Sequence, residues 1–289
     1  MSPAPRLADV VRVLEDLYPP GTAEDWDAVG LVAGDPEQEV RKILFAVDPV
    51  DSVADEALDW GADLVVTHHP LLLRAVHSVA ATTFKGALVH RLVRSGTALY
   101  VAHTNADAAP GGVADALADL LGVVGRRPLV PSDADPEVRG IGRVGRLEAP
   151  TTLGAFAAHV AAVLPATAQG VRVAGDPHAQ VRTVAVVGGS GDSLFDDVRA
   201  AGADVYVTAD LRHHPASELR ERAEFGAGTP YLVDVAHFAS EWPWLEHAAR
   251  DVVARLGGTV EPRVSTRSTD PWTLRIASPE LPPTERTPQ

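Results

Sequence analysis

Two adjacent histidines, His68 and His69, follow a short apolar run in the segment Asp63–Pro70. The run, residues 64–67, has the length and composition of a buried strand, which would place both histidines at its carboxyl end. In open α/β sheets, ligands bind at the carboxyl ends of the strands. Adjacent imidazoles can bind metal ions, but a bare His-His dipeptide also occurs on solvated surface loops. The pair by itself therefore leaves both a metal site and a surface loop open.

Partners for a metal site stand further along the chain. His237 and Glu241 are four residues apart, a spacing that places both side chains on one face of a helix. Asp107 follows another expected strand. Three imidazoles and two carboxylates suit zinc, iron or manganese, whereas calcium prefers oxygen ligands alone. The candidate metal ligands are therefore His68, His69, Asp107, His237 and Glu241.

Five ligands are too few for two separate closed metal sites. They fit two divalent metal ions about 3.5–4 Å apart that share one carboxylate. Glu241 is the natural bridging residue, because a carboxylate offers two oxygens and an imidazole offers one free nitrogen. The sequence therefore predicts a dinuclear centre of zinc, iron or manganese, with two divalent metal ions per chain.

The elements that must position these residues alternate between strands and helices. Apolar runs predict strands, and apolar positions at helical spacing predict helices. Expected strands cover 43–47, 64–67, 98–102, 142–147, 184–187, 205–208 and 231–235. Expected helices cover 7–17, 53–60, 84–94, 113–121, 153–164, 193–201, 216–223 and 241–256. This alternation predicts an α/β fold with mixed, mostly parallel sheets that helices cover on both faces.

The two halves of the chain share a phrase, which indicates an internal duplication. Gly61–Thr67 reads Gly-Ala-Asp-Leu-Val-Val-Thr, and Gly202–Thr208 reads Gly-Ala-Asp-Val-Tyr-Val-Thr. In both halves, a later strand leads into the motif His-x-x-x-acid, which begins at His103 and at His237. We therefore expect two related βα lobes whose strand ends face one cleft that holds the two metals.

A proline-rich stretch at residues 126–137 interrupts the alternation and marks the best candidate boundary. We expect an N-terminal α/β lobe over 1–125 and a linker with a short strand-helix-strand remnant over 126–182. A C-terminal α/β lobe would cover 183–263. Residues 264–289 are rich in serine, threonine, proline and charge, so we expect a flexible tail there.

Composition excludes several classes of protein. The chain of 289 residues has no cysteine, so any metal site must use His, Asp or Glu. The formal net charge is −14 and no basic run occurs, so a nucleic-acid partner is not expected. The N-terminus lacks an apolar signal core, and no apolar stretch is long enough to span a bilayer. We therefore expect a cytoplasmic protein without a membrane anchor.

Five phrases of the chain resemble the type-two GTP cyclohydrolase I family, also called the Nif-three-like dinuclear metal centre hexameric family. They are Trp26–Leu31, Thr67–Pro70, His103–Gly112, Thr208–His214 and His237–Glu241. The resemblance implies the same five metal ligands, with the glutamate contacting both ions. It also implies a toroidal homo-hexamer whose metal sites face the interior.

The chain departs from the family pattern in two places. Ala28 stands where the family commonly has asparagine, so a polar contact in the Trp-Asp loop would be missing. Longer relatives insert a small domain between the two halves. The interval 126–182 is too short for a full copy, so a function carried by that insert is not expected here.

Two further histidines are candidate catalytic residues. The resemblance places His103 and His214 along the cleft, where either could move a proton. His103 could instead fix the orientation of Asp107, and His214 could be an ordinary surface residue. Asp210 could assist catalysis or cap a helix. The turn Gly188–Gly191 could cradle a phosphate, but it lacks the Lys-Ser or Lys-Thr of a P-loop, so a tight turn is the alternative.

These features favour a metal-dependent hydrolase that acts on a nucleotide-like or phosphate-bearing small molecule. The resemblance suggests GTP cyclohydrolase chemistry, in which the guanine ring opens and formate is lost. The alternative is a non-enzymatic metal-binding hexamer that stores, delivers or senses metal, or that serves as a scaffold for a protein partner. The same five ligands would serve both functions, so the sequence leaves the two open.

Overall fold

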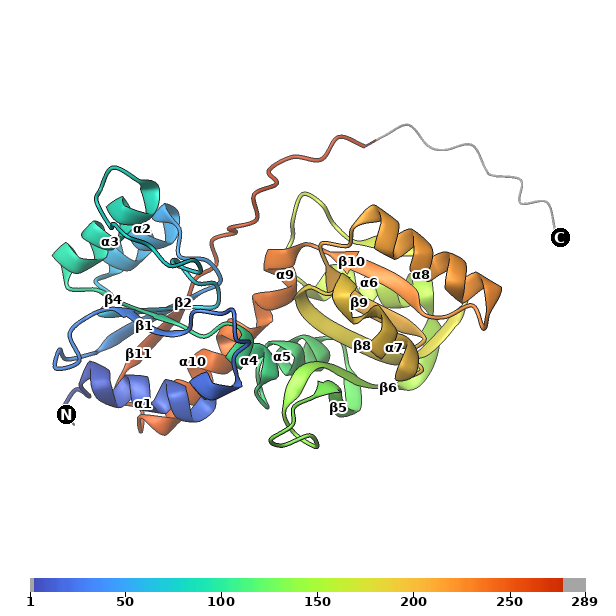
Figure 1. Cartoon of the computed structure of the whole chain (residues 1–289), viewed down its shortest axis with the longest axis horizontal. Helices are drawn as coiled ribbons and strands as arrows, with labels where there is room; N and C mark the ends of the chain where they lie inside the picture. The colour runs from blue at the N-terminus through green and yellow to red at the C-terminus, as the bar shows by residue number, and fades with distance from the viewer. Residues whose placement is uncertain (1–2, 278–289) are drawn as a thin grey trace.

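The structure is a computed structural model that describes residues 3–277. Figure 1 shows two lobes that lie side by side, each built around its own β-sheet. Helices α4, α5, α9 and α10 lie near the junction between the lobes (Figure 1). Within the described residues, no helix is both long and apolar enough to cross a membrane.

The sheet of the first lobe has five strands and is mostly parallel. Its order is β1 (Gly30–Ala33), β4 (Ala98–Val101), β3 (Leu64–Thr67), β2 (Lys42–Ala46) and β11 (Glu261–Val264). Strands β4, β3, β2 and β11 are parallel neighbours, and β1 runs antiparallel to β4. Every residue of β3 and β4 is buried, because helices cover both faces of a parallel sheet.

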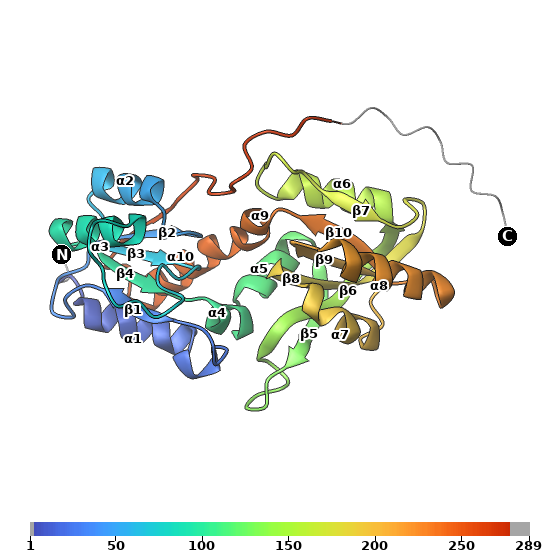
Figure 2. The same ribbon diagram turned by 45° about the horizontal axis from the view of Figure 1, so that its top comes forward.

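Alternate residues of the first sheet face two different helical layers. Ile43 and Phe45 lie in the same core cluster as residues of α1 (Leu7–Leu17) and α10 (Pro243–Arg255). The other face of the sheet packs against α2 (Asp51–Trp60) and α3 (Phe84–Ser95). Figure 2 shows α2 and α1 on opposite sides of this sheet. The first lobe is thus a three-layer α/β unit whose last helix comes from the C-terminal part of the chain.

The sheet of the second lobe has six strands and is mixed. Its order is β5 (Val123–Pro131), β6 (Gly140–Thr152), β8 (Gln180–Ser190), β9 (Val205–Ala209), β10 (Tyr231–Val235) and β7 (Arg172–Ala174). Strands β8, β9 and β10 are parallel, whereas the pairs β5–β6, β6–β8 and β7–β10 are antiparallel.

Helices also cover both faces of the second sheet. Helices α5 (Val113–Leu120) and α6 (Leu153–Val163) pack on one face, whose core includes Phe156. Helices α7 (Phe195–Ala200) and α8 (His213–Phe225) pack on the other face (Figure 2). Two five-residue helices follow central strands, α4 (Thr104–Ala108) after β4 and α9 (His237–Glu241) after β10. The single-turn helices are η1 (Pro20–Thr22) and η2 (Asp192–Leu194).

The predicted fold class is confirmed, because the structure is a mixed α/β fold with two mixed sheets. The division into segments 1–125, 126–182, 183–263 and 264–289 stays a prediction about domains. Sheet membership crosses these segments: β5, β6 and β7 join the second sheet, and β11 joins the first. The helix expected over 241–256 is wrong in its start, because α9 ends at Glu241 and α10 begins at Pro243.

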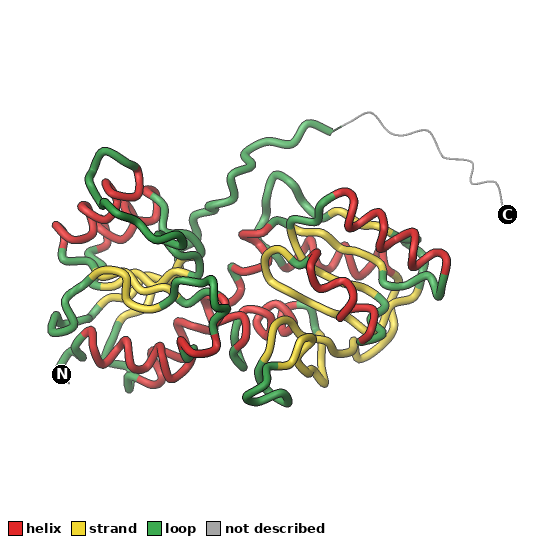
Figure 3. The backbone as a smooth tube through the Cα atoms, in the orientation of Figure 1, coloured by secondary structure: helices red, strands yellow, loops and turns green. Residues whose placement is uncertain are grey.

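Part of the expected flexible tail lies outside the described residues, namely 278–289. The described part, residues 265–277, forms no helix or strand and is drawn as a loop in Figure 3. It leaves the first lobe after β11 and passes toward the second lobe (Figures 1 and 3). Ser265 is buried and donates a hydrogen bond to Glu56 Oε2 at 2.7 Å. The start of this segment is therefore anchored to the first lobe.

Candidate metal centre

The carboxyl ends of central strands in both lobes meet at one place. His68 and His69 follow β3, and Asp107 lies on the short helix after β4. His237 and Glu241 are the first and last residues of α9, which follows β10 in the second lobe. Within each sheet, parallel strands have their carboxyl ends at the same edge, so the side chains that follow these strands lie close together. The structure brings all five predicted metal ligands into one cluster.

Glu241 lies at the centre of this cluster. Its side chain is 3% exposed, and its two oxygens face imidazoles from both lobes. Glu241 Oε1 is 2.9 Å from His237 Nε2 and 3.4 Å from His68 Nε2, and Oε2 is 3.2 Å from His69 Nε2. Asp107 lies at the margin, with Oδ1 3.8 Å from His68 Nε2. One buried carboxylate therefore joins three imidazoles.

The two histidines of the first lobe are held by their Nδ1 atoms. His68 Nδ1 lies 3.0 Å from the carbonyl oxygen of Ala102, and His69 Nδ1 lies 2.7 Å from Asp48 Oδ1. Each contact places a ring proton on Nδ1 and leaves Nε2 facing the cluster, where it can bind a metal ion once its own proton is displaced. A carboxylate or carbonyl on the second nitrogen is the usual way in which proteins orient metal-binding histidines.

His237 is held in the same way within the second lobe. Its Nδ1 lies 2.7 Å from Asp210 Oδ2, and its Nε2 lies 3.2 Å from His69 Nε2. Asp210 has a φ of 55°, a left-handed conformation that is unusual for a residue other than glycine. The neighbouring backbone N–H of Leu211 donates to Asp234 Oδ1 at 3.1 Å, which helps to hold this turn. Asp210 therefore orients His237; the residue that directly precedes α8 is Arg212.

The sequence analysis missed Asp48 and Thr269. Asp48 stands just past the end of β2, the parallel neighbour of β3, so its position after an apolar strand was a usable signal. Thr269 donates its hydroxyl proton to Asp48 Oδ2, the oxygen that His69 does not use. No local pattern marks Thr269, because it lies in a segment that reads as a tail.

Charges within the cluster shift its ionisation equilibria strongly. Burial disfavours the charged form of His69, but the Glu241 and Asp48 carboxylates together outweigh burial and raise the pKa of His69 to about 11. Burial opposes the charged form of His237 as well, and the Glu241 and Asp210 carboxylates raise its pKa to about 10. Burial opposes ionisation of Glu241 as well, yet its imidazole neighbours hold its pKa well below the usual range. Burial raises the pKa of Asp107 to about 6.

The donor atoms fit a metal ion. Two groups have donor atoms within 4.8 Å of one another: His68, His69 and His103, and His69, His237 and Glu241. His68 Nε2 is buried and makes no hydrogen bond to any described residue. A buried polar atom without a partner is rare in folded proteins and often marks an ion site. A metal ion would satisfy this atom and replace the protons that Glu241 otherwise holds on the imidazoles.

Gly189 is required by the close approach of β8 to the cluster. A Cβ atom there would lie 2.6 Å from Glu241 Oε1 and 3.1 Å from His237 Nε2, and its φ is +70°. The Gly189 N–H donates to Ser240 Oγ at 2.8 Å. That amide is therefore occupied, and Gly188 and Gly189, near the end of β8, pack against Glu241. The structure does not favour a phosphate cradle at this turn.

His103 lies beside the cluster and lines a cleft of about 540 Å³. Its Nδ1 is 2.8 Å from Asp27 Oδ1, and its ring centroid is 5.1 Å from that of His68. Burial, and then the neighbouring imidazole of His68, lower the pKa of His103. Ala28, which follows Asp27, donates its N–H to Asp27 Oδ1 at 2.7 Å. This hydrogen bond uses the backbone of Ala28, so the expected loss of an asparagine side-chain contact at this position stays a prediction.

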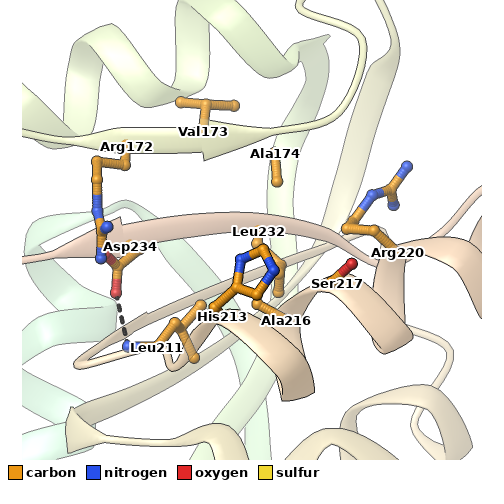
Figure 4. Close-up of a pocket in the computed structure, with 10 residues that line it drawn as sticks. All are labelled: Arg172, Val173, Ala174, Leu211, His213, Ala216, Ser217, Arg220, Leu232 and Asp234. Carbon is orange, nitrogen blue, oxygen red and sulfur yellow. Dashed lines mark hydrogen bonds and ion pairs between the residues drawn. The ribbon is translucent and has the colours of Figure 1, made fainter.

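The structure does not bring His214 to the cluster. His214 is exposed on α8, its ring centroid lies 5.1 Å from that of His213, and it is not among the residues that line the cleft. Its catalytic role stays a prediction to which the described contacts add nothing. His213 lines a different pocket of about 340 Å³ between α8, β7 and β10, shown in Figure 4. There, the Asp234 carboxylate pairs with Arg172 (Figure 4).

Comparisons with known proteins identify the family of the chain. The family model described as Duf34/NIF3 (NGG1p interacting factor 3) matches residues 5–271. A protein of Streptomyces coelicolor named "GTP cyclohydrolase 1 type 2 homolog" is 56% identical over 95% of this chain and 96% of its own. A Mycobacterium leprae protein of the same name is 38% identical, over 93% of this chain and 95% of its own.

Solved structures show the same fold. A Bacillus cereus protein related to NIF3 superposes with a TM-score of 0.85 at 24% identity, over 95% of this chain and 100% of the other. A Staphylococcus aureus hypothetical protein superposes with a TM-score of 0.84 at 26% identity, with the same coverage of both chains. Sequence and structure therefore agree that this chain belongs to the Duf34/NIF3 family.

Proposed function

We propose that this chain is a metal-dependent hydrolase that acts on a nucleotide-like small molecule at a dinuclear centre. The observation that carries the proposal is the buried Glu241 carboxylate, whose two oxygens face imidazoles from both lobes. A buried carboxylate needs cations beside it, and these would be protonated imidazoles in the metal-free chain and metal ions in the loaded chain. The proposed ligands of two zinc, iron or manganese ions are His68, His69, Asp107, His237 and Glu241.

The two oxygens of Glu241 support a pair of ions rather than one. Oε1 faces His237 and His68, whereas Oε2 faces His69. A carboxylate that offers each oxygen to different nitrogens has the arrangement expected of a bridging ligand. Asp107 would complete the set on the side of His68.

When bound, two divalent ions would supply Lewis acidity and an activated water at neutral pH. The chain itself contributes orientation, because Asp48 and Asp210 fix the imidazoles of His69 and His237. It also contributes a base. Asp27 accepts a hydrogen bond from the Nδ1–H group of His103, and burial lowers the pKa of that imidazole. The His103 imidazole is then neutral, and its Nε2 can accept a proton from a group bound in the cleft.

The names of the relatives suggest the first substrates to test. Several are named "GTP cyclohydrolase 1 type 2 homolog", so we propose a guanine nucleotide or a compound like it as the substrate. We also propose that the chain assembles as a homo-hexamer, as its family resemblance implies. Light scattering on the purified protein tests the assembly independently of the chemistry.

The experiment that tests the function uses the full chain and one matched variant. Metal per chain is measured by mass spectrometry, and the loaded protein is assayed against guanine nucleotides and a panel of phosphoesters. Glu241→Gln keeps the size of the side chain and removes its charge. We expect the wild type to bind metal and turn over at least one compound, and the variant to lose both properties. Equal rates for both proteins on the whole panel would refute the hydrolase proposal.

A further inference from the structure

Among the described residues, the ionisable side chains that line the cleft beside the cluster are carboxylic acids and histidines, with no lysine or arginine. Proteins that grip phosphate groups usually supply a guanidinium, an ammonium or free backbone N–H groups. The Gly189 N–H, which could have helped, is occupied by Ser240. The imidazoles of His69 and His237 also line the cleft, but each is already paired with carboxylates. The chain itself therefore offers no free cationic clamp for the phosphates of a nucleotide.

The same cleft is lined by one large exposed aromatic side chain, Trp26. Its side chain is 58% exposed, which is high for a tryptophan. The indole meets His103 edge to face, with ring centroids 5.9 Å apart and an interplanar angle of 78°. Only part of the ring system is used in this contact, so aromatic surface remains open beside the catalytic candidate.

The loop that carries Trp26 is fixed on both sides. The Glu24 N–H donates to Thr104 Oγ1 at 2.9 Å. Asp27 accepts hydrogen bonds from the N–H and the hydroxyl of Thr104, and it also contacts His103. Thr104 is the first residue of α4, the helix that carries Asp107, so the loop with Trp26 is hydrogen-bonded to that helix. Trp26 is therefore a preorganised surface rather than a side chain on a loose loop.

Apolar side chains from the second lobe complete the cleft. Val130, Ile141 and Leu194 line it together with Trp26. The volume of about 540 Å³ lies in the range that proteins use for small organic ligands. Ser190, Ser193 and the Glu24 carboxylate supply polar groups that can bind ring N–H or amino groups. An aromatic surface, apolar walls and a few acceptors suit a flat heteroaromatic ring.

We propose that Trp26 is the stacking surface for an uncharged planar heteroaromatic ring of the purine type, and that the chain recognises this ring rather than the phosphates. The inference rests on the proposed function in one respect only, namely that the reacting group lies at the metal cluster. Any phosphate on the ligand would contact the metals or solvent.

The test measures binding of guanosine, GTP and inorganic tripolyphosphate to the metal-loaded full chain by calorimetry. Stacking of a base on an aromatic side chain typically changes affinity about tenfold or more on alanine substitution. We expect Trp26→Ala to weaken guanosine binding about tenfold, and Trp26→Phe to keep most of it. Phe225→Ala is the matched control, because Phe225 is 97% exposed on α8 and does not line the cleft. It should leave guanosine binding unchanged.

A second arm uses the metal-free chain. Here GTP should bind no more tightly than guanosine, and tripolyphosphate should not bind, because no lysine or arginine lines the cleft and the imidazoles of His69 and His237 are already paired with carboxylates. The proposal is overturned if guanosine does not bind, if Trp26→Ala binds it as the wild type does, or if the metal-free chain prefers GTP tenfold. A change in oligomeric mass in Trp26→Ala with unchanged binding would make Trp26 an assembly contact instead.

These outcomes separate the inference from the proposed function. Guanosine binding that depends on Trp26, without turnover of any compound, would leave the ring site standing and remove the hydrolase. Turnover that is unchanged in Trp26→Ala would support the hydrolase and remove the ring site at Trp26.

Discussion

The short helices α4 and α9 are built in the same way, but the histidine beside each has a pKa that is shifted in the opposite direction. Each comes after a parallel strand, and each is associated with a His-x-x-x-acid motif, His103 to Asp107 and His237 to Glu241. In both, an aspartate holds Nδ1 of the histidine. Yet the pKa of His237 is raised to about 10, whereas burial and His68 lower the pKa of His103.

The difference comes from what faces each histidine across the cluster. His237 Nε2 lies 2.9 Å from the buried Glu241 carboxylate, so a cation is favoured there. His103 faces the rings of His68 and His69, with centroids 5.1 and 5.5 Å away, so a positive charge on it is disfavoured. Under the proposed function, one copy of the motif would provide a metal-binding imidazole and the other a neutral base. Neighbours contributed by distant segments, rather than the motif itself, decide the role.

The largest expected effect is the loss of metal affinity on changing the acid of each His-x-x-x-acid motif, and it should differ between Glu241 and Asp107. Glu241→Gln should weaken metal binding by more than about a hundredfold, beyond the 10–100-fold cost of losing a residue that orients a ligand. Asp107→Asn should cost less, because Asp107 Oδ1 is 3.8 Å from His68 Nε2 at the margin of the cluster. Zinc titration monitored by calorimetry measures both. A larger loss at Asp107 would mean that the centre lies on the α4 side.

The number of protons released on metal binding should distinguish His237 from His103. Groups with raised pKa values stay protonated until the pH approaches about 11 for His69 and about 10 for His237. Metal must displace these protons, so affinity should rise with pH, by up to about a hundredfold per unit when two protons leave. Calorimetry in buffers of different ionisation enthalpy counts the protons released. His237→Gln should lower the count by about one, and His103→Gln should leave it unchanged.

The orienting aspartates offer a matched pair. Asp210→Asn should weaken metal binding about 10–100-fold, because His237 loses the carboxylate on Nδ1. Asp27→Asn removes the equivalent partner of His103. It should change metal affinity only slightly and reduce turnover instead. If both variants lose metal equally, then His103 is a ligand and the contrast between α4 and α9 is wrong.

The smallest effect tests the contact between the C-terminal segment and the site. Thr269→Val removes the hydroxyl that donates to Asp48, the residue that orients His69. A hydrogen bond to a carboxylate contributes about 1.5–3 kcal/mol, but this one would act on the metal only through Asp48 and His69, so metal affinity should fall a few-fold. Thr269→Ser restores the hydroxyl and should bind as the wild type does. If Val and Ser behave alike in zinc titrations, the hydroxyl does not position His69.

The parts of the site that the sequence could predict are those carried by local signals. Apolar strands that end in polar residues marked His68 and His69, and helical spacing marked His237 and Glu241. Convergence of the two halves followed from the repeated phrase. The fold class follows from the alternation of strands and helices, which depends on local hydrophobic periodicity.

The remaining parts depend on long-range contacts that leave no local trace. Thr269 and Asp48 are 221 positions apart in sequence, and no periodicity pairs them. The membership of β11 in the first sheet is of the same kind. His214 shows the limit of the repeat: its His-His-Pro phrase matches that of His68, but α8 already begins at His213 and carries the side chain away from the cleft.

Anomalous diffraction from crystals of the metal-loaded protein would locate the metals relative to both lobes. We expect two metal peaks about 3.5–4 Å apart, with Glu241 contacting both and with ligands from α4, α9 and the residues that follow β3 around them. A metal held by the residues of one lobe alone, or no peak beside Glu241, would contradict this expectation.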